Sequence, residues 1–101
     1  MITAFAAQCR DAPDAPRLRR QHLQAHLDHV EQVMDNILLA GPLKGPDGAD
    51  VGSLIILAVA NAAQAQAMLA ADPYFQAGVW DDIRIERFLP VAGTLVGGRN
   101  W

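Results

Sequence analysis

The order in which hydrophobic periodicity changes along the chain is the feature that most constrains its fold. Short apolar or alternating segments, typical of strands, are separated twice by longer segments in which apolar residues recur every three to four positions, as in a helix. Strands are therefore expected at 1–9, 36–42, 53–60 and 82–88, and helices at 16–34 and 62–71. The resulting order is strand, helix, strand, strand, helix, strand.

Two details support the helical segments. In the first, Leu23, Leu27, Val30 and Met34 fall on one face, and we expect this face to pack on the sheet. The second segment follows Asn61, whose side chain can accept a hydrogen bond from the free backbone N–H groups at a helix start. Both segments are therefore expected to be helices.

This order predicts an α+β fold of the ferredoxin-like, βαββαβ type, with a four-stranded antiparallel sheet and two helices on one face. The third strand is apolar on both sides, with Leu54 and Ile56 on one and Ile55 and Leu57 on the other. Only one set can meet the helices, and an exposed apolar patch commonly marks an interface. We therefore expect a homodimer in which two sheets meet face to face around a two-fold axis.

The length of 101 residues suits a single domain, expected at 1–90, followed by a glycine-rich tail at 91–101. Four arrangements of the tail are open. It could be disordered, add an edge strand or reach across to a partner subunit, or it could fold back over the open face of the sheet in place of a partner. The sequence alone does not choose among them.

Composition excludes several classes of protein. A net charge of −3 argues against a nucleic-acid surface, which is normally basic. The longest apolar run, "LIILAVA", is far shorter than the roughly 20 residues that a membrane-spanning helix needs, and no leader segment is recognised at the start. Cys9 is the single cysteine, which suits a reducing compartment, and we expect it to be a small apolar strand residue in a cytoplasmic protein.

Three histidines, His22, His26 and His29, lie close together on the first expected helix, with Arg19 at the margin of their stripe. They could form local hydrogen bonds only, bind a metal, or act as a general acid or base near neutral pH. The i, i+4 spacing of His22 and His26 suits a shared ion, but a helical His-Glu-x-x-His pattern is absent. We therefore expect no metal site.

The stretch "DPYFQAG" at 72–78 follows the second expected helix. Asp72 suits the cap of a short helical turn, Pro73 its first position, and Gly78 its end. The remaining question is whether Asp72 also orients a basic group from elsewhere in the chain.

Three segments, "HLDHVEQVMDNILLAGPL", "GSLIILAV" and "AADPYFQAGVWDDIRIERF", together resemble the YCII-related family. The resemblance covers roughly residues 1–90 and implies a ferredoxin-like homodimer of the dimeric α/β-barrel superfamily. It also implies a pocket shared by a histidine of the first helix and the aspartate of the Asp-Pro-aromatic turn. These are matched here by His26, or alternatively His22, and by Asp72.

By the same resemblance, the residues expected to bind substrate are Arg19, His22, Ser53, Pro73 and Tyr74, whereas His26 and Asp72 are expected to be catalytic. Tyr74 could equally be a core residue. One family member removes chloride from a chlorinated hydroxyhydroquinone, so small oxygenated aromatic compounds are one candidate substrate class.

We therefore expect a small-molecule enzyme that transfers a proton without a metal or organic cofactor. The reaction would be an isomerisation or an elimination such as dehydrochlorination, which would make the protein an isomerase or a lyase. His26 would remove the proton, Asp72 would orient His26, and Arg19 would hold an anionic oxygen. The alternative is a non-catalytic dimeric module that binds a small ligand or a protein.

Overall fold

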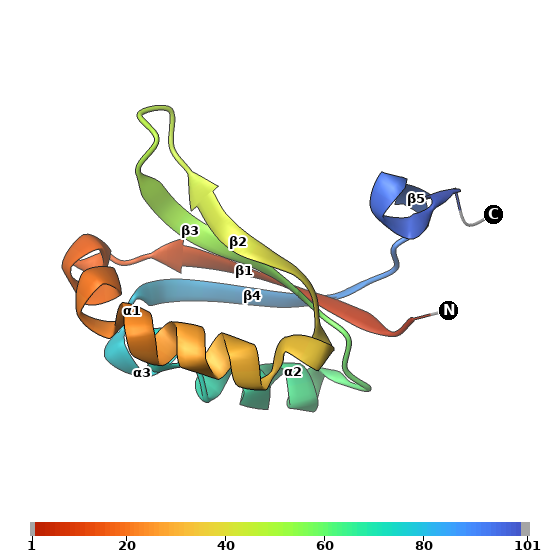
Figure 1. Cartoon of the computed structure of the whole chain (residues 1–101), viewed down its shortest axis with the longest axis horizontal. Coiled ribbons are helices and arrows are strands. Elements are labelled where there is room, and N and C mark those ends of the chain that lie inside the picture. Colours follow the sequence, from red (N-terminus) through yellow and green to blue (C-terminus); the bar gives the residue numbers. More distant parts are fainter. Residues whose placement is uncertain (1, 100–101) are drawn as a thin grey trace.

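The computed structural model describes residues 2–99 and has one four-stranded antiparallel sheet with the strand order β2-β3-β1-β4. Its strands are β1 (Ala4–Asp11), β2 (Ile37–Lys44), β3 (Asp50–Leu57) and β4 (Trp80–Phe88). The helices are α1 (Ala15–Gln32), α2 (Ala62–Ala70) and α3 (Pro73–Ala77), with a 3₁₀ turn, η1, at Met34–Asn36. All three helices lie on the same side of the sheet (Figure 1). The predicted ferredoxin-like α+β fold is therefore confirmed.

The inner face of the sheet, toward the helices, carries the core. Register places Cys9 opposite Ser53 and Ile83, and Ala7 opposite Ile55 and Ile85, so these residues share one face. The buried cluster joins strand and helix residues and consists of Phe5, Ala7, Cys9, Ala15, Ile55, Leu57, Val59, Ala65, Leu69, Tyr74, Val79 and Trp80. Cys9 is buried among them as a free thiol, as expected for a small apolar strand residue.

The third strand lies three residues earlier than predicted, at 50–57 instead of 53–60. Asp50 and Gly52 lie before the predicted start of this strand, but both are paired with β2. At the other end, Asn36 and Ala58 exchange two hydrogen bonds, from Ala58 N to the Asn36 carbonyl and from the Asn36 side chain to the Ala58 carbonyl. These bonds hold Ala58 beside Asn36, and β3 ends at Leu57.

The prediction for the inward face of α1 was wrong. Leu23, Leu27 and Met34, expected to pack on the sheet, are 48%, 48% and 52% exposed. The buried and half-buried positions of α1 are instead Ala15, Leu18, Arg19, His22, His26 and His29, together with Val30, which alone of the four expected residues is half-buried. Polar residues can occupy this face because Arg19 and His26 find partners there, described below. The histidine stripe thus lies on the inner face of the helix.

The opposite face of the sheet is open in this chain (Figure 1). Register places Leu39, Leu54 and Ile56 on this outer face, and Leu39 is 49% exposed. The tail beyond β4 forms a small separate hairpin of β5 (Ala92–Gly93), η2 (Thr94–Val96) and β6 (Gly98–Arg99), which does not join the main sheet. Within residues 2–99, no helix has the length and apolar character needed to cross a bilayer.

Candidate active site

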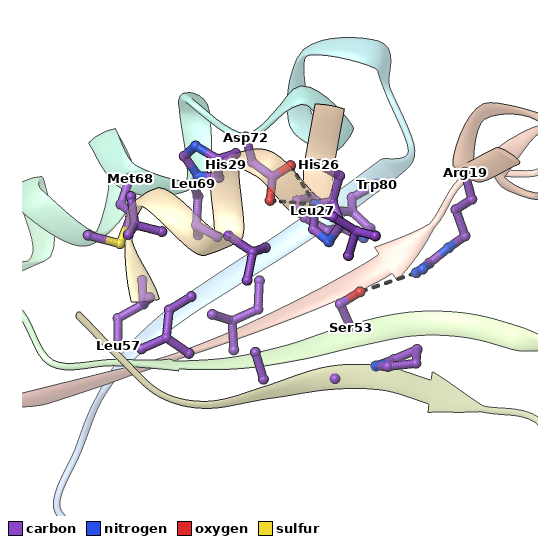
Figure 2. A pocket seen from close by; sticks show the side chains of 17 residues that line it. Arg19, His26, Leu27, His29, Ser53, Leu57, Met68, Leu69, Asp72 and Trp80 are labelled. Atoms are coloured by element: carbon purple, nitrogen blue, oxygen red, sulfur yellow. Dashed lines mark hydrogen bonds and ion pairs between the residues drawn. The ribbon is translucent and has the colours of Figure 1, made fainter. Parts of the chain in front are cut away.

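A pocket of about 250 Å³ opens between α1 and the inner surface of β2 and β3. Arg19 and Ser53 lie at one end and Met68 and Leu57 at the other, with the side chains of His26 and Asp72 between them (Figure 2). Most of the remaining lining is apolar and comprises Leu27, His29, Val30, Val33, Ile37, Ala40, Gly41, Pro42, Ile55, Leu69 and Trp80. The pocket therefore has one polar end and one apolar arm.

The turn that supplies Asp72 has the predicted construction. Asp72 is the N-cap of α3, and its Oδ1 accepts a hydrogen bond of 2.8 Å from the backbone N–H of Tyr74. Pro73 occupies the first helical position, and Gly78 ends the helix in the left-handed region with φ 81°. Asp72 is only 4% exposed, so capping fixes a buried carboxylate in one orientation.

The same carboxylate meets His26 from the first helix. His26 Nδ1 lies 2.8 Å from Asp72 Oδ1 and 3.0 Å from Oδ2, across 46 positions of sequence. An ionised carboxylate only accepts hydrogen bonds, so this contact favours the tautomer with its proton on Nδ1. Nε2 is then the nitrogen with a lone pair available to a molecule in the pocket. The arrangement suits proton abstraction.

The ring of His26 is also held from one side. Tyr74 stacks on it with 3.8 Å between ring centroids and 2° between ring planes. The Tyr74 hydroxyl donates to the backbone carbonyl of Arg19 at 3.3 Å. Burial raises the pKa of Tyr74, and the carboxylates nearby add to this, so the phenol stays neutral. Carboxylate and tyrosine together fix the position and the plane of the imidazole.

Arg19 is tied into a charged cluster at the polar end. Its Nε and Nη2 donate to the two carboxylate oxygens of Asp11, both at 2.9 Å, and Nη2 also approaches the Gly52 carbonyl and the Ser53 hydroxyl at 3.1 Å. Asp50 adds an ion pair at 3.6 Å from Nη1. Burial lowers the pKa of Arg19, but the hydrogen bond and charge of Asp11 outweigh it and leave the pKa raised. Two carboxylates therefore offset the positive charge of Arg19.

The structure places the expected site residues in three groups. His26, Asp72, Arg19 and Ser53 line the pocket. Pro73 and Tyr74 belong to the supporting turn, and Tyr74, 3% exposed, is stacked against His26 outside the lining. His22 is half-buried on α1 one turn before His26 and is also outside the lining.

Other lining residues were not assigned to the site from the sequence. His29 was identified as part of the histidine stripe but was given no role of its own, and it follows His26 by one helical turn. Trp80, Met68 and Leu69 come from β4 and α2 and could only be placed once the packing of these elements was known. Among residues 2–99, no group of three or more His, Cys, Asp and Glu side chains is arranged to hold a metal ion.

Comparisons of the sequence with known proteins all indicate the same protein family. The model of the YCII-related domain matches residues 3–89. Protein YciI of Escherichia coli O6:H1 is 30% identical over an alignment of 95 residues; the match covers 86% of this chain and 97% of YciI, and Protein YciI of Shigella flexneri matches to the same extent.

Two solved structures share the fold. The 5-chloro-2-hydroxyhydroquinone dehydrochlorinase of Burkholderia phenoliruptrix AC1100, in complex with 2,5-dihydroxybenzoquinone, matches with a TM-score of 0.78 and 24% identity. That match covers 90% of this chain and 96% of the dehydrochlorinase. A NIPSNAP family protein of Agrobacterium tumefaciens matches with a TM-score of 0.55 and 13% identity, over 90% of this chain and 94% of its own. At these identities the likenesses establish the architecture alone.

Proposed function

The chain belongs to the YCII-related family, and from this membership and the geometry of the pocket we propose that it is a small-molecule enzyme that transfers a proton. The observation that carries the proposal is the hydrogen bond between His26 Nδ1 and the buried carboxylate of Asp72, at the wall of an apolar pocket. General acid–base catalysis requires a titratable group that is held in a fixed orientation within a cavity, and here a carboxylate orients the histidine.

His26 is the proposed base. Its Nε2 accepts a proton from the substrate, while Asp72 keeps the ring oriented and stabilises the imidazolium that forms, as an acid does beside histidine in other enzymes. Ser53 accepts a hydrogen bond from Arg19, which leaves its own hydroxyl hydrogen to donate to a substrate oxygen. In this assignment Arg19 positions Ser53 and supplies no unpaired positive charge.

Two reactions share this first step. In an elimination, the electron pair released by proton removal expels a leaving group as its bond to carbon breaks, so that chloride leaves and the proton remains on His26. In an isomerisation, the imidazolium returns the proton to a different atom of the same molecule. Elimination is supported by the dehydrochlorinase named above, which shares the fold over 90% of this chain. We therefore take chlorinated hydroxyhydroquinones as the first substrates to test.

The experiment is chloride release from 5-chloro-2-hydroxyhydroquinone, followed with a chloride electrode for the natural protein, His26→Ala and His22→Ala. Loss of a general base is expected to lower the rate on the order of 10²-fold or more. His22→Ala is the matched change on the same helix face, outside the pocket lining, and is expected to retain most activity. Equal rates for the natural protein and His26→Ala would refute the proposal.

A binding module without catalysis is the second candidate. One observation favours it: the charged groups at the polar end are paired with one another. Arg19 is held by Asp11 and Asp50, so its charge is not left free to act on a substrate. In that case a ligand would bind the natural protein and His26→Ala equally well, and no compound would be turned over by either.

We also propose that two copies pair through the outer faces of their sheets. Leu39, Leu43 and Phe88 are 49%, 40% and 40% exposed there, beside the half-buried Leu54. Covering them removes apolar surface from water. Sedimentation equilibrium is expected to give twice the chain mass, and Leu39→Lys to shift the population toward monomers. A monomer at all concentrations would contradict this pairing.

A further inference from the structure

Two segments of the chain run side by side from the polar end of the pocket to its apolar arm. Arg19, His26 and Val33 are seven residues apart and therefore follow one another along the inner face of α1 and its end, at intervals of about 10 Å. On the inner face of β3 the order runs from Ser53 to Leu57. Figure 2 shows the same direction, from Arg19 and Ser53 past His26 to Leu57. A ligand lying along the pocket therefore meets a polar group, the base and apolar side chains in this order.

The arm is lined by side chains that are only partly covered. Val33, Ile37 and Met68 line the pocket, and each of them is half-buried. Val33 follows α1, Ile37 begins β2 and Met68 lies in α2. The cavity of about 250 Å³ far exceeds the roughly 10–15 Å³ that one water molecule needs, so a molecule can enter it. Covering the apolar surface of these side chains is favourable in free energy.

The far end of the arm offers little to a polar group. Figure 2 shows His29 between His26 and Met68, and the side chains at the far end, Met68 and Leu57, are apolar. Neither of these two carries a charge or a strong hydrogen-bonding group. A polar substituent at this end would lose its water without gaining a partner, which is costly. The far end of the arm therefore suits a hydrocarbon group.

Met68 is the adjustable part of this end. Leu57 is 1% exposed and belongs to the buried cluster, whereas Met68 is half-buried and packs against that cluster from outside. A methionine side chain is unbranched and flexible, so it can fit itself to the space beside it. The length of Met68 therefore determines how far a substituent can extend beyond His26.

We propose that the substrate is a single ring with an apolar substituent that occupies the arm, and that Met68 limits the length of this substituent. An oxygen on the ring meets the Ser53 hydroxyl, the carbon that loses its proton lies beside His26, and the substituent points toward Met68. This inference rests on the proposed function and names the substrate class for the same pocket. The cavity lies at the small end of ligand pockets, which suits one ring with a short chain.

The test measures the binding of phenol, 4-ethylphenol, 4-butylphenol and 4-hexylphenol by NMR titration. The proteins are the natural protein, Met68→Ala and Gln66→Ala. Gln66 is the matched control, because it is an exposed, unbranched side chain on α2 outside the pocket lining. A further probe, 4-(3-hydroxypropyl)phenol, has the shape of 4-butylphenol but ends in a hydroxyl group. Thermal unfolding of each variant shows that it is folded.

In the natural protein, affinity is expected to rise roughly fourfold for each CH₂ that enters the arm, and to stop rising before 4-hexylphenol, where the substituent reaches Met68. In Met68→Ala the rise continues, and 4-hexylphenol binds at least roughly threefold more tightly than to the natural protein, whereas phenol binds equally. Gln66→Ala behaves as the natural protein. The hydroxypropyl compound is expected to bind roughly fivefold or more weakly than 4-butylphenol, because its hydroxyl is left without a partner.

If Met68→Ala does not fold, the methionine methyl signals of the natural protein decide. The chain contains three methionines, and Met68→Leu assigns the signal of Met68. We expect 4-butylphenol to move this signal and phenol to leave it in place. A Met68 signal that responds equally to both compounds would overturn the proposal.

The proposal is also overturned if affinity depends on chain length in the same way in the natural protein and Met68→Ala, or if the hydroxypropyl compound binds as tightly as 4-butylphenol. These failures are separable from failure of the proposed function, because binding needs no turnover. A chain-length limit set by Met68 together with full chloride release by His26→Ala would refute the catalytic role of His26 and keep the role of the arm. The converse pair of results would refute the role of the arm alone.

Discussion

The imidazole of His26 lies flat against the ring of Tyr74, with 3.8 Å between centroids and planes only 2° apart. Neither residue is near the other in sequence, and their contact joins α1 to α3. Because the backbone N–H of Tyr74 also bonds to Asp72 Oδ1, one short turn supplies both the carboxylate and the ring that hold the histidine. The geometry of the site therefore depends on the packing of α1 against α3, and the contributions of the carboxylate and of the tyrosine ring can be tested separately.

Tyr74→Leu is expected to lower turnover more than Tyr74→Phe. Phenylalanine keeps the ring that stacks on His26 and loses only the 3.3 Å hydrogen bond to the Arg19 carbonyl, which costs about 1 kcal/mol of stability. Leucine removes the stack, worth about 0.5–1.5 kcal/mol beyond burial, and frees the imidazole plane. Steady-state kinetics check this, with thermal unfolding as the control for stability. Equal turnover by the two variants would contradict a role in positioning.

Replacing Asp72 separates capping from orientation. Asp72→Asn keeps an oxygen that can accept from Tyr74 N–H, so we expect a small change in unfolding free energy, whereas Asp72→Ala should lose about 1 kcal/mol from the cap. Both should lower turnover on the order of 10²-fold or more, because each removes the negative charge that stabilises the imidazolium of His26. Denaturant unfolding and kinetics measured on both variants check this. Full activity in Asp72→Asn would show that the carboxylate only caps the helix.

The buried thiol of Cys9 predicts a loss of stability at high pH. Burial, with the charges of Asp72 and Asp11, raises its pKa from the ordinary 9.0 to about 12. Between these values the unfolded chain releases the proton and the folded protein keeps it, so unfolding free energy falls as pH rises, by up to about 1.4 kcal/mol per unit.

Denaturant unfolding at several pH values checks this, with Cys9→Ala as the control that should have a shallower pH dependence. Other groups titrate in the same range in both proteins and cancel in the comparison. Identical slopes would show that Cys9 ionises equally well in the folded and unfolded states.

Gly52 is required by the close approach of two strands. A Cβ at this position would lie 2.3 Å from the backbone oxygen of Cys9, whereas a Cβ at Gly41 would meet nothing within 4 Å. We expect Gly52→Ala to cost about 2 kcal/mol or more, as overpacking of a tight contact does, and Gly41→Ala to be nearly neutral. Thermal unfolding of the two variants measures the difference, and equal melting temperatures would contradict it.

The sequence was sufficient for the parts of the fold that depend on local signals. Hydrophobic periodicity gave the order of strands and helices, and residue types gave the Asn61 cap and the Asp72–Gly78 turn, each with the expected hydrogen bond. These features depend on residues within a few positions of one another, and they can therefore be predicted from local sequence patterns.

The inner face of α1 could not be predicted in this way. The pattern of Leu23 and Leu27 assumes that apolar side chains face inward, but the polar residues Arg19 and His26 occupy the inner face, half-buried. Their partners are distant in sequence: Ser53 for Arg19 and Asp72 for His26. The family resemblance had suggested that His26 and Asp72 meet, but only the assembled fold shows the partners of Arg19, and the same is true of the place of Trp80 in the pocket.

The most direct test of the account is the tautomer of His26, measured by long-range ¹H–¹⁵N NMR at a pH where the ring is neutral. If Asp72 orients the base, the proton lies on Nδ1 and Nε2 carries the lone pair, and Asp72→Asn shifts the proton toward Nε2. A neutral ring protonated on Nε2 in the natural protein, unchanged in Asp72→Asn, would contradict it.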